Sequence, residues 1–205
     1  MTQKEPTLVL ASGNAGKIRE FQAMFAPLKV HVESQKAFGV KSCPEPFHTF
    51  IENCLAKARH AAKETGLPAM ADDSGLCVDA LGGAPGVYSA RFAGEDATDE
   101  DNNRLLMKKL SGVTNRRGHY VCVLVAVRFA DDPEPLIAEG AWMGEIAEAP
   151  KGEGGFGYDP YFYLPEQGAT AAELSPEAKN ASSHRGKALA KMAKLLKDRW
   201  GWGAE

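Results

Sequence analysis

Short apolar runs alternate with amphipathic stretches in the first part of the chain. Residues 7–11 form an apolar run after a polar start, which predicts a buried strand. After a polar, glycine-containing break, Ile18, Phe21 and Phe25 recur at i, i+3 and i+7, which predicts an amphipathic helix. Residues 29–33 alternate between apolar and polar positions. The pattern therefore predicts a strand, a helix and a second strand.

Three further helices are predicted from spacing and capping signals. The longest covers residues 49–65 and ends at Gly66, with Pro68 beyond it. Its apolar stripe consists of Ile51, Leu55, Ala58 and Ala62. Thr98 is predicted to cap a helix that runs to about Leu110. The last helix is expected to begin near Ser183, with a buried face of Leu189, Met192, Ala193 and Leu196.

A long hairpin is predicted in the second half of the chain. Residues 120–129 are almost continuously apolar, which is typical of a central strand buried on both faces. Residues 131–135 predict a turn, and residues 136–147 predict the partner strand. Helices and strands alternate before this hairpin interrupts them, so we expect an α/β fold with a mixed sheet. With 205 residues and no linker-like stretch, residues 1–205 are expected to form a single domain.

Composition and charge exclude several classes of function. The formal net charge is −3, whereas a general nucleic-acid binder usually carries a basic surplus, so we expect no nucleic-acid partner. No stretch approaches the roughly 20 apolar residues of a membrane span, so we expect no membrane partner. The four cysteines are far apart and form no CxxC pair, which favours reduced thiols over disulfides or zinc. We therefore expect a cytoplasmic protein.

The first candidate for chemistry lies where the first strand meets the first helix. It is the segment Ser12-Gly13-Asn14-Ala15-Gly16-Lys17. A helix start offers backbone N–H groups to an anion, and Lys17 adds a charge. Ile18 follows the lysine, so the segment is not a phosphate loop of the Walker type. The alternative is an ordinary capped helix with a solvated lysine.

The second candidate is the acidic segment Asp72-Asp73-Ser74-Gly75, between two apolar runs. We expect a turn here. Adjacent carboxylates repel each other unless a cation or donors neutralise them, and magnesium prefers a few carboxylates with phosphate oxygens and water. The segment therefore predicts a magnesium site, and the alternative is a solvated acidic turn. Glu45, in a loop bounded by Pro44 and Pro46, is a weaker candidate.

Two segments near the C-terminus are candidates for binding a base. Glycines flank Phe156 in Gly154-Gly155-Phe156-Gly157-Tyr158-Asp159-Pro160, which would let its ring face a base. The alternative is an irregular turn whose aromatic rings lie in the core. The second segment is Ser183-His184-Arg185-Gly186-Lys187, with Lys179 upstream. Cationic side chains do not favour a helix start, so they predict a polar ligand; the alternative is a basic surface cluster.

Together these segments resemble the inosine triphosphate pyrophosphatase family. The resemblance runs from Leu8 to about Leu196 and includes SGNAGK, TFIENCLAKARHAA, ADDSGLCVDALGGAPGVYSARFAG, GGFGYDPYF and NASSHRGKAL. It implies an elongated, two-lobed α/β fold around a central mixed sheet, with an active-site cleft between the lobes. It also implies a homodimer, a magnesium requirement and hydrolysis of ITP, dITP and XTP, in which water attacks the α-phosphorus and pyrophosphate leaves.

The resemblance also implies a role for each matching residue. Asp73 would be the catalytic residue and a magnesium ligand, with Glu45 and Asp72 as further ligands. The triphosphate would be bound by Ser12, Gly13, Asn14, Ala15, Gly16, Lys17 and Lys57, and Ser74 would touch the substrate. The nucleotide pocket would be lined by Phe156, Gly157, Tyr158 and Asp159, and the base edge would be read by Lys179, His184 and Arg185.

The chain departs from the family pattern beside Glu45. The family usually has a glycine two residues after the acidic position, where this chain has Phe47. Residues 200–205 lie outside the resemblance. Three alternatives remain: a pyrophosphatase for other nucleotides, a nucleotide-binding regulator without catalysis, and a nucleic-acid-binding module. The intact acidic residues and the acidic net charge argue against the last two.

Overall fold

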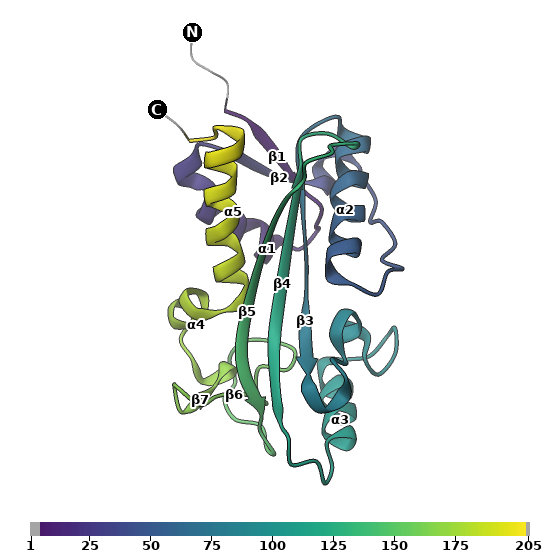
Figure 1. The fold of residues 1–205 in the computed structure, drawn as a ribbon, viewed down its shortest axis with the longest axis vertical. Coiled ribbons are helices and arrows are strands. Elements are labelled where there is room, and N and C mark those ends of the chain that lie inside the picture. Colours follow the sequence, from purple (N-terminus) through teal and green to yellow (C-terminus); the bar gives the residue numbers. More distant parts are fainter. Residues whose placement is uncertain (1–4, 204–205) are drawn as a thin grey trace. The chain divides into compact units, whose positions relative to one another are not determined.

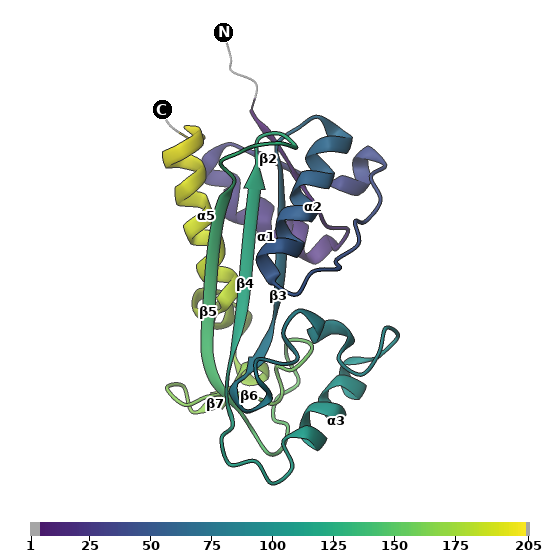
Figure 2. The same cartoon turned by 45° about the vertical axis from the view of Figure 1, so that its right-hand side comes forward.

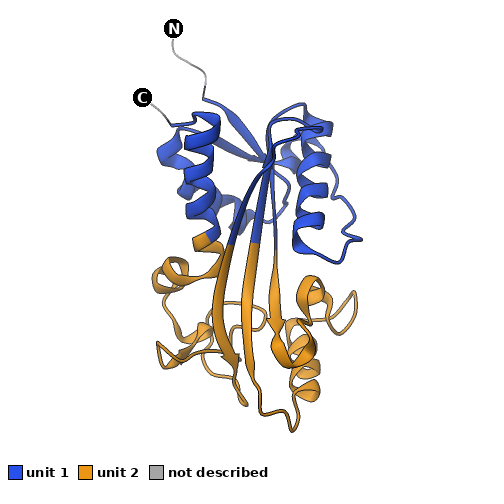
Figure 3. Cartoon of the chain, viewed as in Figure 1, with its two compact units in different colours: residues 1–73, 123–139, 188–205 blue, residues 74–122, 140–187 orange. Residues whose placement is uncertain are grey.

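The structure of the protein is a computed structural model, which describes residues 5–203. The chain divides into two compact units (Figure 3). Unit 1 comprises residues 1–73, 123–139 and 188–205, and unit 2 comprises residues 74–122 and 140–187. That these units form a single two-lobed domain remains a prediction.

Helices and strands alternate along the first half of the chain, as the sequence predicts. The helices are α1 (Ala15–Phe25), α2 (Phe50–Thr65), α3 (Asp99–Lys109), α4 (Pro176–Ser182) and α5 (His184–Trp200). The strands are β1 (Thr7–Leu10), β2 (His31–Ser34), β3 (Ala69–Val78), β4 (Arg117–Val127), β5 (Leu136–Ile146), β6 (Phe162–Leu164) and β7 (Ala169–Thr170). The predicted helix and strand bounds are therefore confirmed to within a few residues for most elements.

The strands of the described chain form one sheet in the order β2-β1-β3-β4-β5-β6-β7. β1 is parallel to β2 and β3, with Leu10 opposite both Ser34 and Met70, whereas β6 is antiparallel to β5 and β7. The predicted α/β fold with a mixed sheet is thus confirmed. β4 and β5 are neighbours in the sheet, as the predicted hairpin requires.

In unit 1, α2 covers one face of the sheet, and α1 and α5 cover the other (Figures 1 and 2). Helix α2 begins where the Thr49 side chain accepts a hydrogen bond from the N–H of Glu52, and it ends at Gly66 in the left-handed conformation. Its predicted apolar stripe is partly wrong, because Ile51 is 42% exposed while Asn53 is buried. The buried face of α2 therefore carries a polar side chain that requires a partner.

Unit 2 has its own hydrophobic core, formed around the lower parts of β3, β4 and β5 in Figure 1. Leu106 of α3 and Phe162 of β6 are fully buried in it. Helix α3 begins with the predicted Thr98 cap, to which Asp101 adds a reciprocal hydrogen bond. This cap fixes the first turn of α3.

The rest of the described chain bears on three further expectations. The C-terminal residues pack back onto unit 1: the rings of Trp200 and Trp202 meet edge to face at 4.9 Å, and a Cβ at Gly203 would lie 2.8 Å from the Cα of Leu28. None of the four cysteines, all of which are described, is part of a disulfide. Among residues 5–203, no helix combines the length and the apolar character needed to cross a membrane.

Candidate active site

The turn after β1 is held by its own side chains. Ser12 Oγ accepts a hydrogen bond from Asn14 N (3.1 Å), and Asn14 Oδ1 accepts one from Lys17 N (3.1 Å), which makes Asn14 the N-cap of α1. Ser34 Oγ, at the end of β2, donates to Ser12 O (2.7 Å). Gly13, Asn14, Ala15 and Gly16 are exposed at the helix start. The predicted helix start is confirmed, and its role in phosphate binding remains a prediction.

Lys36 lies beside this turn, although nothing in the local sequence singles it out. Its ammonium is 3.5 Å from the carbonyl oxygen of Gly13, and a Cβ built on Gly13 would lie 2.0 Å from Lys36 Cε. The signal that finds it is topological. Because β1 and β2 are parallel with Leu10 opposite Ser34, the residues after both strands must meet at one sheet edge. Lys36 is therefore a further cation at the candidate phosphate site.

The predicted turn at the acidic segment is wrong, because Ala69–Val78 forms one continuous strand. Successive side chains of a strand point to opposite faces, so Asp72 and Asp73 diverge. Asp72 is 3% exposed, and its carboxylate pairs with Lys17 of α1, with Lys17 Nζ 2.7 Å from Asp72 Oδ2. Asp73 and Ser74 are half-buried. The repulsion expected between adjacent acids is thus relieved by alternation and by an ion pair.

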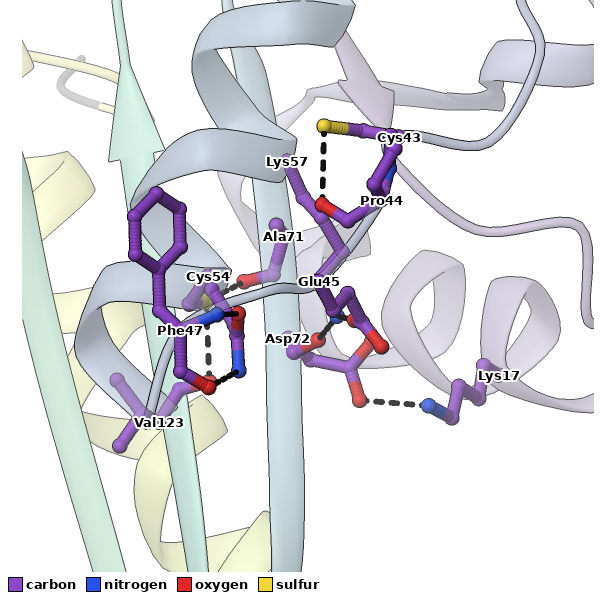
Figure 4. A network of polar contacts seen from close by, with 11 residues as sticks. Lys17, Cys43, Pro44, Glu45, Phe47, Cys54, Lys57, Ala71, Asp72 and Val123 are labelled. Atoms are coloured by element: carbon purple, nitrogen blue, oxygen red, sulfur yellow. Dashed lines mark hydrogen bonds and ion pairs between the residues drawn. The ribbon is translucent and has the colours of Figure 1, made fainter. Parts of the chain in front are cut away.

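The ammonium of Lys57, in α2, lies among several acidic residues of unit 1 (Figure 4). The ammonium pairs with the Glu45 carboxylate and donates a hydrogen bond to Asp72 O (2.7 Å). Burial of the ammonium works to lower the pKa of Lys57. Nearby carboxylates, of which that of Asp73 acts most strongly, outweigh burial and raise this pKa above its usual value. Lys57 therefore stays charged at the centre of an acidic cluster.

Lys57, Glu45 and Asp72 also border a cavity of about 240 Å³ within unit 1. Its wall is formed by residues of the 11–17 and 42–45 stretches together with Gln35, Lys57 and Asp72. Lys17, Glu45 and Lys57 thus face one space, which is polar and carries both signs of charge. Such a space suits an anionic ligand that arrives with a cation.

The loop that carries Glu45 is clamped to α2, and sequence reasoning missed the residue that clamps it. Asn53 is 1% exposed; its Oδ1 accepts from Phe47 N (3.0 Å) and its Nδ2 donates to Phe47 O (3.1 Å). Figure 4 shows Phe47 beside α2 with its ring directed away from Glu45. Phe47 departs from the family pattern, yet its 40% exposed ring leaves both backbone bonds intact. The departure therefore does not disrupt the loop.

The acidic groups around Lys57 fit a divalent cation. Carboxylate oxygens are the ligands that magnesium prefers, and magnesium commonly uses one or two carboxylates together with substrate phosphates. Among residues 5–203, no set of three or more His, Cys, Asp or Glu side chains is arranged to hold a metal ion by itself. Ligands from Asp73 and Glu45 would therefore be completed by phosphate oxygens. The roles of Asp73, Glu45 and Asp72 as metal ligands remain predictions.

In unit 2, the loop around Phe156 is built on the carboxylate of Asp159. This carboxylate is buried; its Oδ2 accepts from Lys179 Nζ (2.6 Å) and from Phe156 N (2.9 Å), and its Oδ1 accepts from the Tyr120 hydroxyl (3.1 Å). Lys179 also lies 4.7 Å from the centre of the Phe156 ring. The Phe156 side chain is nevertheless 65% exposed. Unit 2 thus presents an open aromatic ring on a fixed backbone.

Two of the predicted pocket residues, Tyr158 and Asp159, are buried. Tyr158 is 4% exposed, its ring belongs to the hydrophobic core of unit 2, and its hydroxyl donates to Ser89 O (2.6 Å). The carboxylate of Asp159 is fully engaged within the protein. Both side chains support the loop from within, and their part in lining the nucleotide pocket remains a prediction. Phe156 and Gly157 remain the loop residues that are accessible to a ligand.

His184 and Arg185 open α5, as predicted. The His184 ring stacks on Tyr120, with ring centres 4.8 Å apart and planes 12° from parallel. A Cβ at Gly186 would lie 1.9 Å from Asn180 O, so only glycine permits the close approach of α4 to the start of α5. The chain turns between the end of α4 and this glycine, so His184 and Arg185 stand at a helix start. Their role in reading a base remains a prediction.

Comparison with known proteins agrees with this arrangement. Residues 8–195 match the Ham1 family. A dITP/XTP pyrophosphatase of Chromobacterium violaceum is 62% identical over 190 residues, which cover 93% of this chain and 96% of that protein. A dITP/XTP pyrophosphatase of Neisseria meningitidis serogroup B is 57% identical over 197 residues, which cover 96% of this chain and 99% of that protein.

A solved structure shows the same relationship. The structure of a HAM1 protein from Coxiella burnetii superimposes with a TM-score of 0.92 at 46% identity, covering 94% of this chain and 99% of that one. Sequence identity and fold thus agree over nearly the whole length of the chain. This chain belongs to the Ham1 family.

Proposed function

We propose that this protein hydrolyses the non-standard purine nucleoside triphosphates ITP, dITP and XTP to the monophosphate and pyrophosphate. The observation that carries the proposal is that Lys57 lies near the Asp73 carboxylate and bonds to Asp72, which pairs with Lys17, in a chain 62% identical to a dITP/XTP pyrophosphatase. This grouping offers a carboxylate for the attacking water and two ammonium groups for the phosphates. Both are required to cleave a phosphoanhydride bond.

The lysines of unit 1 are suited to exchange partners when a triphosphate binds. In the structure, Lys17 is paired with Asp72 and Lys57 with Glu45. A triphosphate carries about four negative charges and would compete for both ammonium groups. Magnesium, when bound, supplies charge neutralisation and orientation of the phosphates. Asp73 and Glu45 would hold the ion, and the exposed turn of residues 12–16 would bind phosphate oxygens through its N–H groups.

In the chemical step we assign Asp73 to orienting the attacking water. The water oxygen forms a bond to the α-phosphorus while the bond from that phosphorus to the bridging oxygen breaks. The electron pair leaves with pyrophosphate, and the proton of the water passes to Asp73 or to solvent. Lys17 and Lys57 offset the charge that gathers on the leaving phosphates.

The base would be bound by unit 2. The exposed Phe156 ring offers a stacking surface, which is worth about 1–3 kcal/mol per base. Lys179, His184 and Arg185 are donors, and hypoxanthine and xanthine carry a 6-keto acceptor where adenine carries an amino group. An adenine would therefore leave donors unpaired, at about 1–3 kcal/mol each. Guanine shares the 6-keto group, so its exclusion requires that no acceptor receive its 2-amino group.

Hydrolysis of ITP in water enriched in oxygen-18 tests the reaction type. We expect the label in inosine monophosphate and none in pyrophosphate, because the water attacks the α-phosphorus. Asp73→Asn should lower kcat by at least about 100-fold. Asp79→Asn is the matched control, since Asp79 is an exposed acid just after the same strand and should leave kcat unchanged. Label in pyrophosphate, or a fully active Asp73→Asn variant, contradicts the proposal; binding of ITP without products would favour the regulator.

Assembly and location belong to the same proposal. We propose a homodimer that acts in the cytoplasm on small nucleotides, without a nucleic-acid or membrane partner. The net charge of −3 supports the absence of a nucleic-acid partner, the four cysteines outside disulfides support the location, and the homodimer rests on the family resemblance. Sedimentation velocity measures the assembly directly, and a monomer at micromolar concentration contradicts that part of the proposal.

A further inference from the structure

The glycine that follows the exposed Phe156 ring is gripped by two side chains of α3. Gly157 N donates to Asp99 Oδ2 (2.8 Å), and Asn103 Nδ2 donates to Gly157 O (2.9 Å). Both polar groups of one residue are thus held by one helix. Asp99 and Asn103 are four residues apart, so they lie on the same face of α3. The capping box at the start of α3 fixes the turn that carries Asp99.

The loop needs such a grip if Phe156 is to stay in one position. Gly155 and Gly157 flank the ring with φ of +72° and +60°, a region that glycine enters freely and leaves freely. A Cβ at Gly157 would meet nothing within 4 Å, so packing does not restrain this residue. Its hydrogen bonds to α3 therefore supply its restraint.

Anchoring the chain does not explain the grip. The next residue, Tyr158, is buried in the core of unit 2, and Asp159 already bonds to Phe156 N. These contacts suffice to tie the loop to the unit. Bonds to both groups of Gly157 add a restraint on a glycine that would otherwise rotate easily beside an exposed ring. A ring held in its bound orientation loses less entropy when a ligand stacks on it.

We propose that Asp99 and Asn103 are positioning residues, which hold Gly157 so that Phe156 is fixed for stacking on the purine. This inference rests on the proposed function and deepens it, because it assigns base affinity to residues that do not touch the base. It separates the two ends of the substrate: weakening the grip should weaken binding of the base and leave binding of the phosphates unchanged.

The neighbouring asparagine provides a matched control. Asn102 is also buried, at 2% exposure against 8% for Asn103, and it makes two hydrogen bonds to backbone where Asn103 makes the one to Gly157 O. Its Oδ1 accepts from Ala93 N (2.8 Å) and its Nδ2 donates to Ala90 O (3.1 Å). Asn102→Ala therefore removes two backbone hydrogen bonds from the same helix and Asn103→Ala removes one, but only Asn103→Ala releases the Phe156 loop.

The test compares three variants with the wild-type protein. Loss of one hydrogen bond predicts that Asn103→Ala raises KM for ITP by about 2- to 10-fold while kcat changes less than about 2-fold. Asp99→Ala should also raise KM for ITP. Because Asp99 is exposed, this variant should fold even if Asn103→Ala does not. Asn102→Ala should leave KM unchanged. The inhibition constant of inorganic triphosphate, which has no base, should be the same in all four proteins.

A second readout does not depend on the enzyme reaction. Amide hydrogen exchange of the segment 154–158 should be faster in Asn103→Ala and Asp99→Ala than in the wild-type protein, and unchanged in Asn102→Ala. Equal KM values for the Asn102 and Asn103 variants, a parallel change for inorganic triphosphate, or unchanged exchange in the loop would overturn the inference. If the wild-type protein does not hydrolyse ITP, the proposed function fails, whereas the exchange experiment still decides whether α3 holds the loop.

Discussion

Replacing Asp159 with Asn should destabilise unit 2 through charge alone. Asp159 Oδ2 accepts from Lys179 Nζ and Phe156 N, and Oδ1 accepts from the Tyr120 hydroxyl. An asparagine at position 159 can keep its oxygen as the acceptor for Lys179 Nζ and Phe156 N. Its NH₂ then turns toward Tyr120, whose hydroxyl accepts. The number of hydrogen bonds is preserved, so the change isolates the loss of the negative charge beside Lys179.

The magnitude follows from burial. Removing one partner of a buried ion pair costs about 3–5 kcal/mol, because the other charge remains without compensation. The Lys179 side chain is 18% exposed and the Asp159 side chain 5%, so water screens the remaining ammonium only partly. We therefore expect Asp159→Asn to lower the free energy of unfolding by about 2–3 kcal/mol. Burial also raises the pKa of Tyr120, so its hydroxyl stays protonated at neutral pH.

Urea denaturation followed by tryptophan fluorescence measures this free energy, provided the slope m is unchanged. Lys179→Met removes the uncompensated charge, so the double variant should recover about 1–2 kcal/mol of the summed losses. Asp198→Asn breaks the exposed pair with Lys194, whose side chains are 48% and 77% exposed, and should cost less than about 0.5 kcal/mol. An Asp159→Asn variant as stable as Asp198→Asn, or zero coupling to Lys179, would refute the reasoning.

Two further changes test the structure at separate points. Asp132 has a fully buried side chain that pairs with Arg128, which together with backbone N–H donors holds the pKa of Asp132 well below its usual value. The ionised Asp132 carboxylate therefore stabilises the folded protein above the unfolded pKa of about 3.9, and this stabilisation is lost as pH falls. The difference in Tm between the wild-type protein and Asp132→Asn should shrink below about pH 4. A difference that stays constant with pH contradicts this. Gly155→Ala should cost about 2–5 kcal/mol, because its Cβ would lie 2.1 Å from Asp159 Oδ2 at a φ of +72°. Gly157→Ala, at +60° but with open space, should cost about 1–2 kcal/mol, and equal losses in urea denaturation would contradict the packing argument.

Local signals predicted the helices well. Thr49 and Gly66 bracket α2 because a hydroxyl cap and a left-handed glycine are encoded by single residues. Thr98 identifies the start of α3 for the same reason. Helix α4 was missed, since its seven residues are too few to show an apolar period. A helix cap can thus be predicted from the sequence where an apolar stripe on the same helix supports the prediction.

The acidic segment shows where local reasoning fails. Asp, Ser and Gly favour turns, so Asp72-Asp73-Ser74-Gly75 predicts a turn. In the fold, Lys17 pairs with the Asp72 carboxylate, and Lys57 bonds to its carbonyl oxygen. Lys17 lies 55 residues and Lys57 15 residues from Asp72 along the chain, so both lie outside the segment itself. The strand is therefore stabilised by tertiary partners that no local pattern reveals.

The candidate site likewise contains some residues that the sequence reveals and others that only the fold reveals. Residues of the phosphate turn and the exposed Phe156 were found from the sequence because their chemistry differs from that of a core. The supporting residues Asn53, Asp99 and Asn103 were missed, since each bonds to backbone atoms of a loop outside its own helix. An asparagine on a buried helix face is the signal that finds such residues, because a buried amide must have a backbone or side-chain partner.

The most direct test of the central claim is pyrophosphate release from ITP, XTP, GTP and ATP, with magnesium and with a chelator. Two base-reading donors at about 1–3 kcal/mol each predict kcat/KM for ITP and XTP at least about 30-fold above that for ATP. GTP should also be a poor substrate, and the chelator should abolish release from all four. Equal release from the four nucleotides, or full activity in the presence of the chelator, would contradict the account.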